Sequence, residues 1–361
     1  MEEIRLMKGN EVIAEAAVRC GCDGYFGYPI TPQSEILETL SAMRPWETTG
    51  MVVVQAESEV AAINMAYGGA SCGKRVMVSS SSPGISLMCE GLSYLAGAEL
   101  PCLVVNVSRG GPGLGTIQPS QADYFQAVKG GGHGDYHLIV LAPNSVQEMY
   151  DFVSLGFDLA FRYRNPVMIL SDGVIGQMME KVVLSTPKPR WSDEQIAEMW
   201  GSWAVTGKPA SRTRNIVTSV ELDPLRQERF NHKLTDKYRT ICEREARCEM
   251  VACEDADYVI VAYGSSARIS QKVVELAAED GSKVGLLRPI TLYPFPEREI
   301  EQLSRRVKGF LSVEMSMGQM IEDVKLASRC RVPVYHFGRT GGVIHTPTEV
   351  YEALKSNFLQ K

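Results

Sequence analysis

The sequence lacks any apolar run that approaches the ~20 residues of a membrane-spanning helix. Its 361 residues are 45% hydrophobic and 22% charged, a balance typical of globular proteins. A secretory signal is also missing, because the opening stretch, MEEIRLMKGNEVIAEAAVRCG, carries acids where such a signal carries bases; we expect it to form an amphipathic helix. The sequence therefore predicts a chain that contacts no membrane and lies in the cytoplasm.

A basic surface and a metal motif are missing as well. The 37 basic and 43 acidic residues give a net charge of −6, and no basic stripe is interleaved with aromatic residues, so we expect no nucleic-acid partner. The nine cysteines form no C-x-x-C pair, and the five histidines are too few and too scattered to complete a zinc set. We expect most of the cysteines to be reduced thiols in the core, and no iron–sulfur cluster held by this chain alone.

The hydrophobic pattern predicts two α/β units. From residue 10 to about 170, short runs rich in β-branched residues alternate with helix-like segments, and the runs are apolar on both faces. Such runs are typical of parallel strands covered by helices on both sides of a sheet. After a stretch rich in Pro, Gly, Ser and Trp, the alternation resumes. We predict a doubly wound parallel sheet in residues 1–190, a linker with a helix in 191–255, and a smaller α/β domain in 256–361.

A carboxylate stands where a predicted strand leads into a predicted helix. In the stretch QAESEVAAINMAYGGA, residues 55–70, Glu59 falls in the first helical turn, where the helix dipole favours a negative charge. An ordinary structural role is therefore open to it. The alanines and glycines that follow leave little side-chain bulk, as is needed when a flat cofactor or another chain approaches closely. A catalytic role is equally compatible with the position.

Four motifs together resemble one family. The pattern E-x-x-A-x-x-M-A from Glu59 is similar to the helix that carries the cofactor-activating glutamate in the pyrimidine modules of thiamin diphosphate enzymes. It is joined by GYPITPQSE (27–35), SSSSPGISLMCEGLSYLAGAELP (79–101) and RGGPGLGTIQPSQADY (109–124). The set resembles the α subunit of the 2-oxoacid:ferredoxin oxidoreductases over essentially the whole chain, with the 2-ketoisovalerate type most similar. The resemblance implies a pyrimidine module followed by a domain like the transketolase C-terminal domain.

The resemblance also implies roles for individual residues. Glu59 would hydrogen-bond N1′ of the aminopyrimidine, Ser82 and Gly84 would lie near the cofactor, and Thr31 and Arg109 would contact the substrate carboxylate. Thr31 has an alternative role as a helix N-cap with proline at the next position. Arg109 follows a predicted strand, at the end where α/β sheets bind ligands, and its guanidinium suits a carboxylate. Its alternative is a surface arginine that caps a loop.

A missing motif points to partner chains. Thiamin diphosphate enzymes hold the diphosphate and Mg²⁺ through G-D-G and a later asparagine, whereas this chain has only CDG at 22–24 and SDG at 171–173. The resemblance therefore implies that a β subunit completes the cofactor site and carries the Mg²⁺. It also implies γ and ferredoxin-like subunits, iron–sulfur clusters on these partners, ferredoxin as electron acceptor and coenzyme A as acyl acceptor. For the second domain we expect a role in assembly.

The implied reaction is oxidative decarboxylation of a 2-oxoacid to acyl-CoA and CO₂. The loop GGPGLG, residues 110–115, has Gly113 and Leu114 where relatives acting on 2-oxoglutarate commonly carry two hydroxyl residues. Such a loop is a poor host for a second carboxylate, which predicts 3-methyl-2-oxobutanoate as the substrate. The alternatives are a 2-oxoglutarate enzyme and a non-catalytic scaffold. A nicotinamide-binding dehydrogenase is disfavoured because GGPGLG does not match G-x-G-x-x-G.

Overall fold

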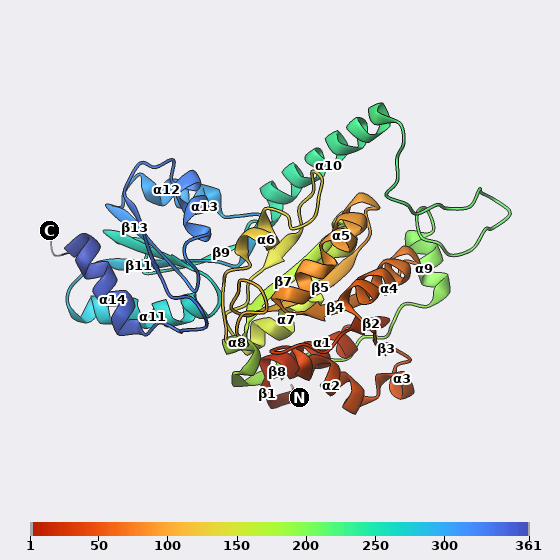
Figure 1. The fold of residues 1–361 in the computed structure, drawn as a ribbon, viewed down its shortest axis with the longest axis horizontal. Helices are drawn as coiled ribbons and strands as arrows, with labels where there is room; N and C mark the ends of the chain where they lie inside the picture. The colour runs from red at the N-terminus through yellow and green to blue at the C-terminus, as the bar shows by residue number, and fades with distance from the viewer. Residues whose placement is uncertain (1–2, 360–361) are drawn as a thin grey trace.

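The computed structural model describes residues 3–359, which form two large sheets and a two-stranded ribbon (Figure 1). The larger sheet has seven strands in this order: β12 (Thr291–Tyr293), β6 (Ile139–Leu141), β7 (Pro166–Asp172), β5 (Cys102–Ser108), β4 (Val76–Ser80), β2 (Gly24–Gly27) and β3 (Val52–Gln55). All neighbours are parallel except β12 and β6. The central strands β4, β5 and β7 are buried along their whole length, as their continuous apolar runs predict.

Helices cover both faces of this sheet. On one face α1 (Gly9–Arg19) packs between α2 (Ser34–Met43) and α7 (Val146–Tyr163), and on the other α4 (Glu59–Ser71) packs on α5 (Ser82–Gly97). This division follows from right-handed crossovers, because the chain steps across the sheet in opposite directions before the two sets. Three short helices lie in the connections: α3 (Pro45–Thr48), α6 (Tyr124–Val128) and α8 (Gly173–Gln177).

The start of the chain differs from its prediction. Residues 3–8 are strand β1 (Glu3–Lys8), which pairs antiparallel with β8 (Met179–Leu184), and the helix α1 begins only at Gly9. The expectation of one amphipathic helix over the whole opening stretch is therefore wrong for β1. The reason is tertiary, since the strand that satisfies the backbone of β1 is β8, which follows the last parallel strand of the first half of the chain.

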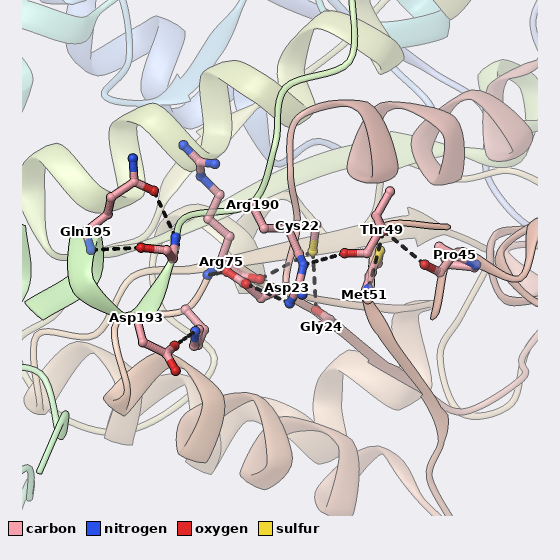
Figure 2. Close-up of polar contacts among 12 residues, drawn as sticks. Cys22, Asp23, Gly24, Pro45, Thr49, Met51, Arg75, Arg190, Asp193 and Gln195 are labelled. Atoms are coloured by element: carbon pink, nitrogen blue, oxygen red, sulfur yellow. Dashed lines mark hydrogen bonds and ion pairs between the residues drawn. The ribbon is translucent and has the colours of Figure 1, made fainter. Parts of the chain in front are cut away.

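The segment after β8 returns along the amino ends of the parallel strands, as Figure 2 shows. Arg190 Nη1 donates to Asp23 Oδ1 at 3.2 Å, and Arg190 Nε donates to the Thr49 carbonyl at 2.8 Å. Asp193, the first residue of α9 (Asp193–Trp200), pairs with Lys74 at 2.6 Å. These bonds fix the path by which the chain leaves the first sheet.

The second half of the chain forms a five-stranded sheet in this order: β14 (Val334–Gly338), β13 (Gly309–Glu314), β10 (Tyr258–Ala262), β11 (Val284–Pro289) and β9 (Cys248–Val251). It is parallel except at β9. The helices are α10 (Pro224–Glu245), α11 (Gly264–Glu279), α12 (Glu297–Ser304), α13 (Met320–Ala327) and α14 (Pro347–Leu354), followed by a π-helical turn (Lys355–Leu359). The range 191–255 thus contains α9, α10 and β9, and the domain limits at 190 and 255 stay a prediction.

The two halves share one sheet and one polar joint. β12 belongs to the second half of the sequence but pairs with β6 of the first sheet. Gln121, which is 2% exposed, accepts hydrogen bonds at its side-chain oxygen from Ser266 Oγ at 2.6 Å and from the Met315 N–H at 2.9 Å. In residues 3–359, no helix is long and apolar enough to cross a membrane.

Candidate active site

Glu59 lies at the carboxyl edge of the seven-stranded sheet, as the first residue of α4. It is only 5% exposed, and Ser80 Oγ, at the end of β4, lies 3.5 Å from its Oε1. A Cβ on Gly84 would overlap Ser80 Oγ and Glu59 Oε1 and would lie 2.8 Å from Glu59 Cγ. Gly84 therefore provides the space that the carboxylate occupies, which gives a physical reason for glycine at this point of α5.

Arg109 connects three of the predicted site residues. It follows β5, is 8% exposed, and donates from Nη1 to the Thr31 carbonyl at 3.0 Å and from Nη2 to the Leu114 carbonyl at 3.1 Å. Its backbone N–H donates to Ser82 Oγ at 2.9 Å. Nε is buried and has no hydrogen-bond partner in residues 3–359. The guanidinium is thus held from two sides with one donor left over.

Thr31 lies in the loop after β2 and does not cap a helix. The helix α2 begins at Ser34, and its N-cap is Gln33, so the alternative N-cap role of Thr31 is wrong. Gln33 is fully buried, accepts from Ser79 Oγ at 2.6 Å and donates to the Tyr28 carbonyl at 3.1 Å. This glutamine, which sequence reasoning missed, anchors the loop and leaves Thr31 exposed beside Arg109.

Asp123 was also missed by sequence reasoning. Asn106 Nδ2, on β5, donates to Asp123 Oδ2 at 2.9 Å. Burial raises the pKa of the Asp123 carboxyl, while hydrogen bonds from Ser82, Asn106 and Ser108 oppose the rise. The available signal was the polar pattern N-x-S at the end of an apolar run, which places Asn106 and Ser108 on one face of a strand.

The arrangement fits the pyrimidine end of thiamin diphosphate. The buried Glu59 carboxylate suits a ring nitrogen, the missing Cβ of Gly84 leaves room at the same place, and Ser81 Oγ is buried without a partner in the described residues. The diphosphate end does not fit. Asp23 lies at the opposite edge on Arg190, and Asp172 caps α8 and accepts from Ser265 Oγ at 2.6 Å. Residues 3–359 contain no group of three or more metal-ligating side chains.

Comparison with known proteins defines the class. Residues 15–223 match the thiamine diphosphate-binding region of pyruvate flavodoxin/ferredoxin oxidoreductases, and residues 256–350 match core domain II of pyruvate:ferredoxin oxidoreductase. The chain belongs to this family of thiamine diphosphate-dependent oxidoreductases. The predicted family, enzyme class and fold are confirmed.

Individual relatives narrow the comparison. The ketoisovalerate oxidoreductase subunit VorB of Methanothermobacter marburgensis is 53% identical over 94% of this chain and 93% of its own. The 2-oxoglutarate synthase subunit KorA of Methanothermobacter thermautotrophicus is 35% identical over 97% and 98%. A solved 2-oxoglutarate:ferredoxin oxidoreductase from Magnetococcus marinus superposes with a TM-score of 0.84 at 26% identity, covering 98% of this chain and 65% of that one.

Proposed function

We propose that this chain provides the proton-transferring carboxylate and the substrate-carboxylate contacts of a branched-chain 2-oxoacid:ferredoxin oxidoreductase. The observation that carries the proposal is the Glu59 carboxylate, buried at the start of α4 in a space that Gly84 leaves free. When bound, thiamin diphosphate supplies the electron sink for decarboxylation. Glu59 would hold N1′ of the aminopyrimidine and share a proton with it, which requires a carboxylate shielded from water.

Arg109 and Thr31 would bind the carboxylate of the 2-oxoacid. Arg109 is fixed by the carbonyls of Thr31 and Leu114, so its position is set before a ligand arrives. Preorganisation of this kind lowers the entropy lost on binding. The unpartnered Nε of Arg109 and the exposed Thr31 are the groups left to face a ligand.

The side chain of the substrate would meet an apolar loop. Leu114, 80% exposed, shares a loop with Arg109, and its carbonyl is bonded to the guanidinium. A second substrate carboxylate there would be buried without a partner, whereas an isopropyl group would bury apolar surface. Together with the 53% identity to a ketoisovalerate oxidoreductase subunit, this supports 3-methyl-2-oxobutanoate as the substrate.

The rest of the enzyme would come from partner chains. A β subunit would bring the diphosphate module and Mg²⁺, and γ and ferredoxin-like subunits would bring the iron–sulfur clusters. Ferredoxin, coenzyme A and a cytoplasmic location complete the proposal. Its support is the poor match of Asp23 and Asp172 to a diphosphate site and the naming of the relatives as subunits.

Glu59→Gln in the assembled complex tests the central role. We expect turnover to fall by at least ~10³-fold, because a neutral amide cannot share the proton, while binding of thiamin diphosphate measured by calorimetry stays within a few-fold. The matched control is Glu57→Gln, two positions earlier and exposed, which should keep near-normal turnover. Near-normal turnover in Glu59→Gln would overturn the assignment.

The substrate is tested by kcat/KM on the complete complex with coenzyme A and ferredoxin. We expect 3-methyl-2-oxobutanoate to exceed pyruvate and 2-oxoglutarate by about tenfold or more, the difference that one buried methyl or one unpaired carboxylate produces. A lead for 2-oxoglutarate would reject the branched-chain substrate and keep the reaction.

A further inference from the structure

The segment 109–121 joins the candidate site to the second half of the chain. It begins at Arg109 and ends at Gln121, whose amide donates to the Tyr263 carbonyl at 2.8 Å. The backbone N–H of Gln121 also donates to the Met315 carbonyl at 2.9 Å. Since these partners lie after β10 and β13, the far end of the segment is fixed by the second sheet.

A second contact lies much closer to Arg109. Residues 110–118 form a closed loop in which the Gly110 N–H donates to the Gln118 carbonyl at 3.0 Å and the Thr116 N–H donates to the Gly110 carbonyl at 2.9 Å. Gly342, in the loop after β14, lies against it. A Cβ on Gly342 would overlap the Cβ of Gln118 and would lie 3.2 Å from Thr116 Cγ2.

The contact is backbone against backbone. A Cβ on Gly110 would lie 3.4 Å from the nitrogen of Gly342, so the loop after β14 touches the residue next to Arg109. Arg109 is in turn bonded to the Leu114 carbonyl inside the same closed loop. A displacement of residues 110–118 therefore moves one of the two carbonyls that hold the guanidinium.

We propose that Gly342 is a positioning residue for the substrate: it sets the place of the loop 110–118 and, through that loop, of the Arg109 guanidinium. The inference rests on the proposed role of Arg109 in binding the 2-oxoacid carboxylate. It gives the second half of the chain a part in substrate binding in addition to the assembly role expected from the sequence. Gln121 holds the other end of the segment in register.

The chain offers a matched pair of glycines for the test. Gly341 and Gly342 both have positive φ, +66° and +88°, so an alanine at either position meets the same kind of backbone strain. A Cβ on Gly341 meets nothing within 4 Å, whereas one on Gly342 collides with Gln118. The two alanine variants differ mainly in whether they push the loop 110–118.

In the assembled complex we expect Gly342→Ala to raise KM for 3-methyl-2-oxobutanoate by about tenfold or more, as a small misplacement of a binding group does, and to leave KM for coenzyme A within about twofold. Gly341→Ala should leave both values within about twofold. Gln118→Gly removes the atoms that collide, so the double variant Gly342→Ala with Gln118→Gly should recover most of the substrate KM.

Two outcomes separate this inference from the function beneath it. If Arg109→Gln leaves the substrate KM unchanged, the proposed role of Arg109 fails. If Arg109→Gln raises the KM but Gly342→Ala behaves like Gly341→Ala, or if Gln118→Gly gives no rescue, the positioning role of Gly342 fails alone. Thermal unfolding of each variant identifies any change that merely unfolds the loop.

Discussion

The two edges of the seven-stranded sheet carry similar polar side chains but treat them differently. At the amino edge Asp23 accepts from the Arg75 N–H at 2.9 Å and from Arg190, and Arg190 also reaches the Thr49 carbonyl (Figure 2). At the carboxyl edge Ser81 Oγ and Arg109 Nε are buried without partners in residues 3–359. Buried polar atoms are normally satisfied, so the difference marks the carboxyl edge as the side that receives a ligand.

The difference has a covalent cause. The returning segment that contains Arg190 covers the amino edge with donors from the same chain. The carboxyl edge is bordered by loops in which Gly84 and Gly110 leave space instead of filling it. Substitutions at the two edges should therefore act on different quantities, activity at one and stability at the other.

The largest effect is expected from filling the space at the carboxyl edge. Gly84→Ala places a Cβ against Ser80 Oγ and the Glu59 carboxylate, and both side chains can rotate away. The fold should survive, but turnover of the complex should fall on the order of a hundredfold because Glu59 is displaced.

Gly68→Ala is the control for this substitution. It lies in the same helix as Glu59, in open space, and should raise the free energy of unfolding by about 0.5–1 kcal/mol while turnover stays normal. Equal turnover in Gly84→Ala and Gly68→Ala would break the comparison between the edges.

A smaller effect, on stability alone, is expected at the amino edge. Asp23→Asn leaves one oxygen for two donors and turns an amide N–H₂ toward Arg75 or Arg190. The free energy of unfolding should fall by about 1–3 kcal/mol in chemical denaturation, with turnover per folded complex unchanged.

Asp193→Asn serves as its surface control. Asp193 pairs with Lys74, but its side chain is 87% exposed, so the loss should stay within about 0.5 kcal/mol. If Asp23→Asn were no more costly than Asp193→Asn, the amino edge would owe little to its hydrogen bonds.

The smallest effect concerns the pH dependence of stability at the carboxyl edge. Burial raises the pKa of Asp123 above its ordinary value of 3.8, so the folded chain binds this proton more tightly than the unfolded chain does. The stabilisation is present below pH 3.8 and is lost as pH rises through the folded pKa. Unfolding free energies measured across this window should fall for the wild type relative to Asp123→Asn; parallel curves would contradict the prediction.

The sequence predicted most of what local pattern controls. The strands β4, β5 and β7 appear as apolar runs, and Glu59 stands at the start of α4 as the strand-to-helix pattern predicted. Resemblance named Thr31, Ser82 and Arg109, which the structure brings into contact, although their roles stay predictions.

Long-range partners were beyond local pattern. β1 was expected as helix because nothing near it in the sequence announces β8, and β9 lies in the predicted linker because its partner β11 comes later. The function of Gly84 was likewise invisible, since it depends on the side chain of Glu59, which belongs to the preceding helix and meets Gly84 only in the fold.

The pairing of β12 with β6 has a consequence for synthesis of the chain on the ribosome. Until Tyr293 has emerged, the first sheet ends at β6 with an unpaired edge, although every other strand of that sheet is already made once Asp172 has been added. An unpaired edge is a template for association with other nascent chains. Completion of the catalytic half therefore waits until translation has passed β12, and a fragment ending at residue 255 should aggregate during expression.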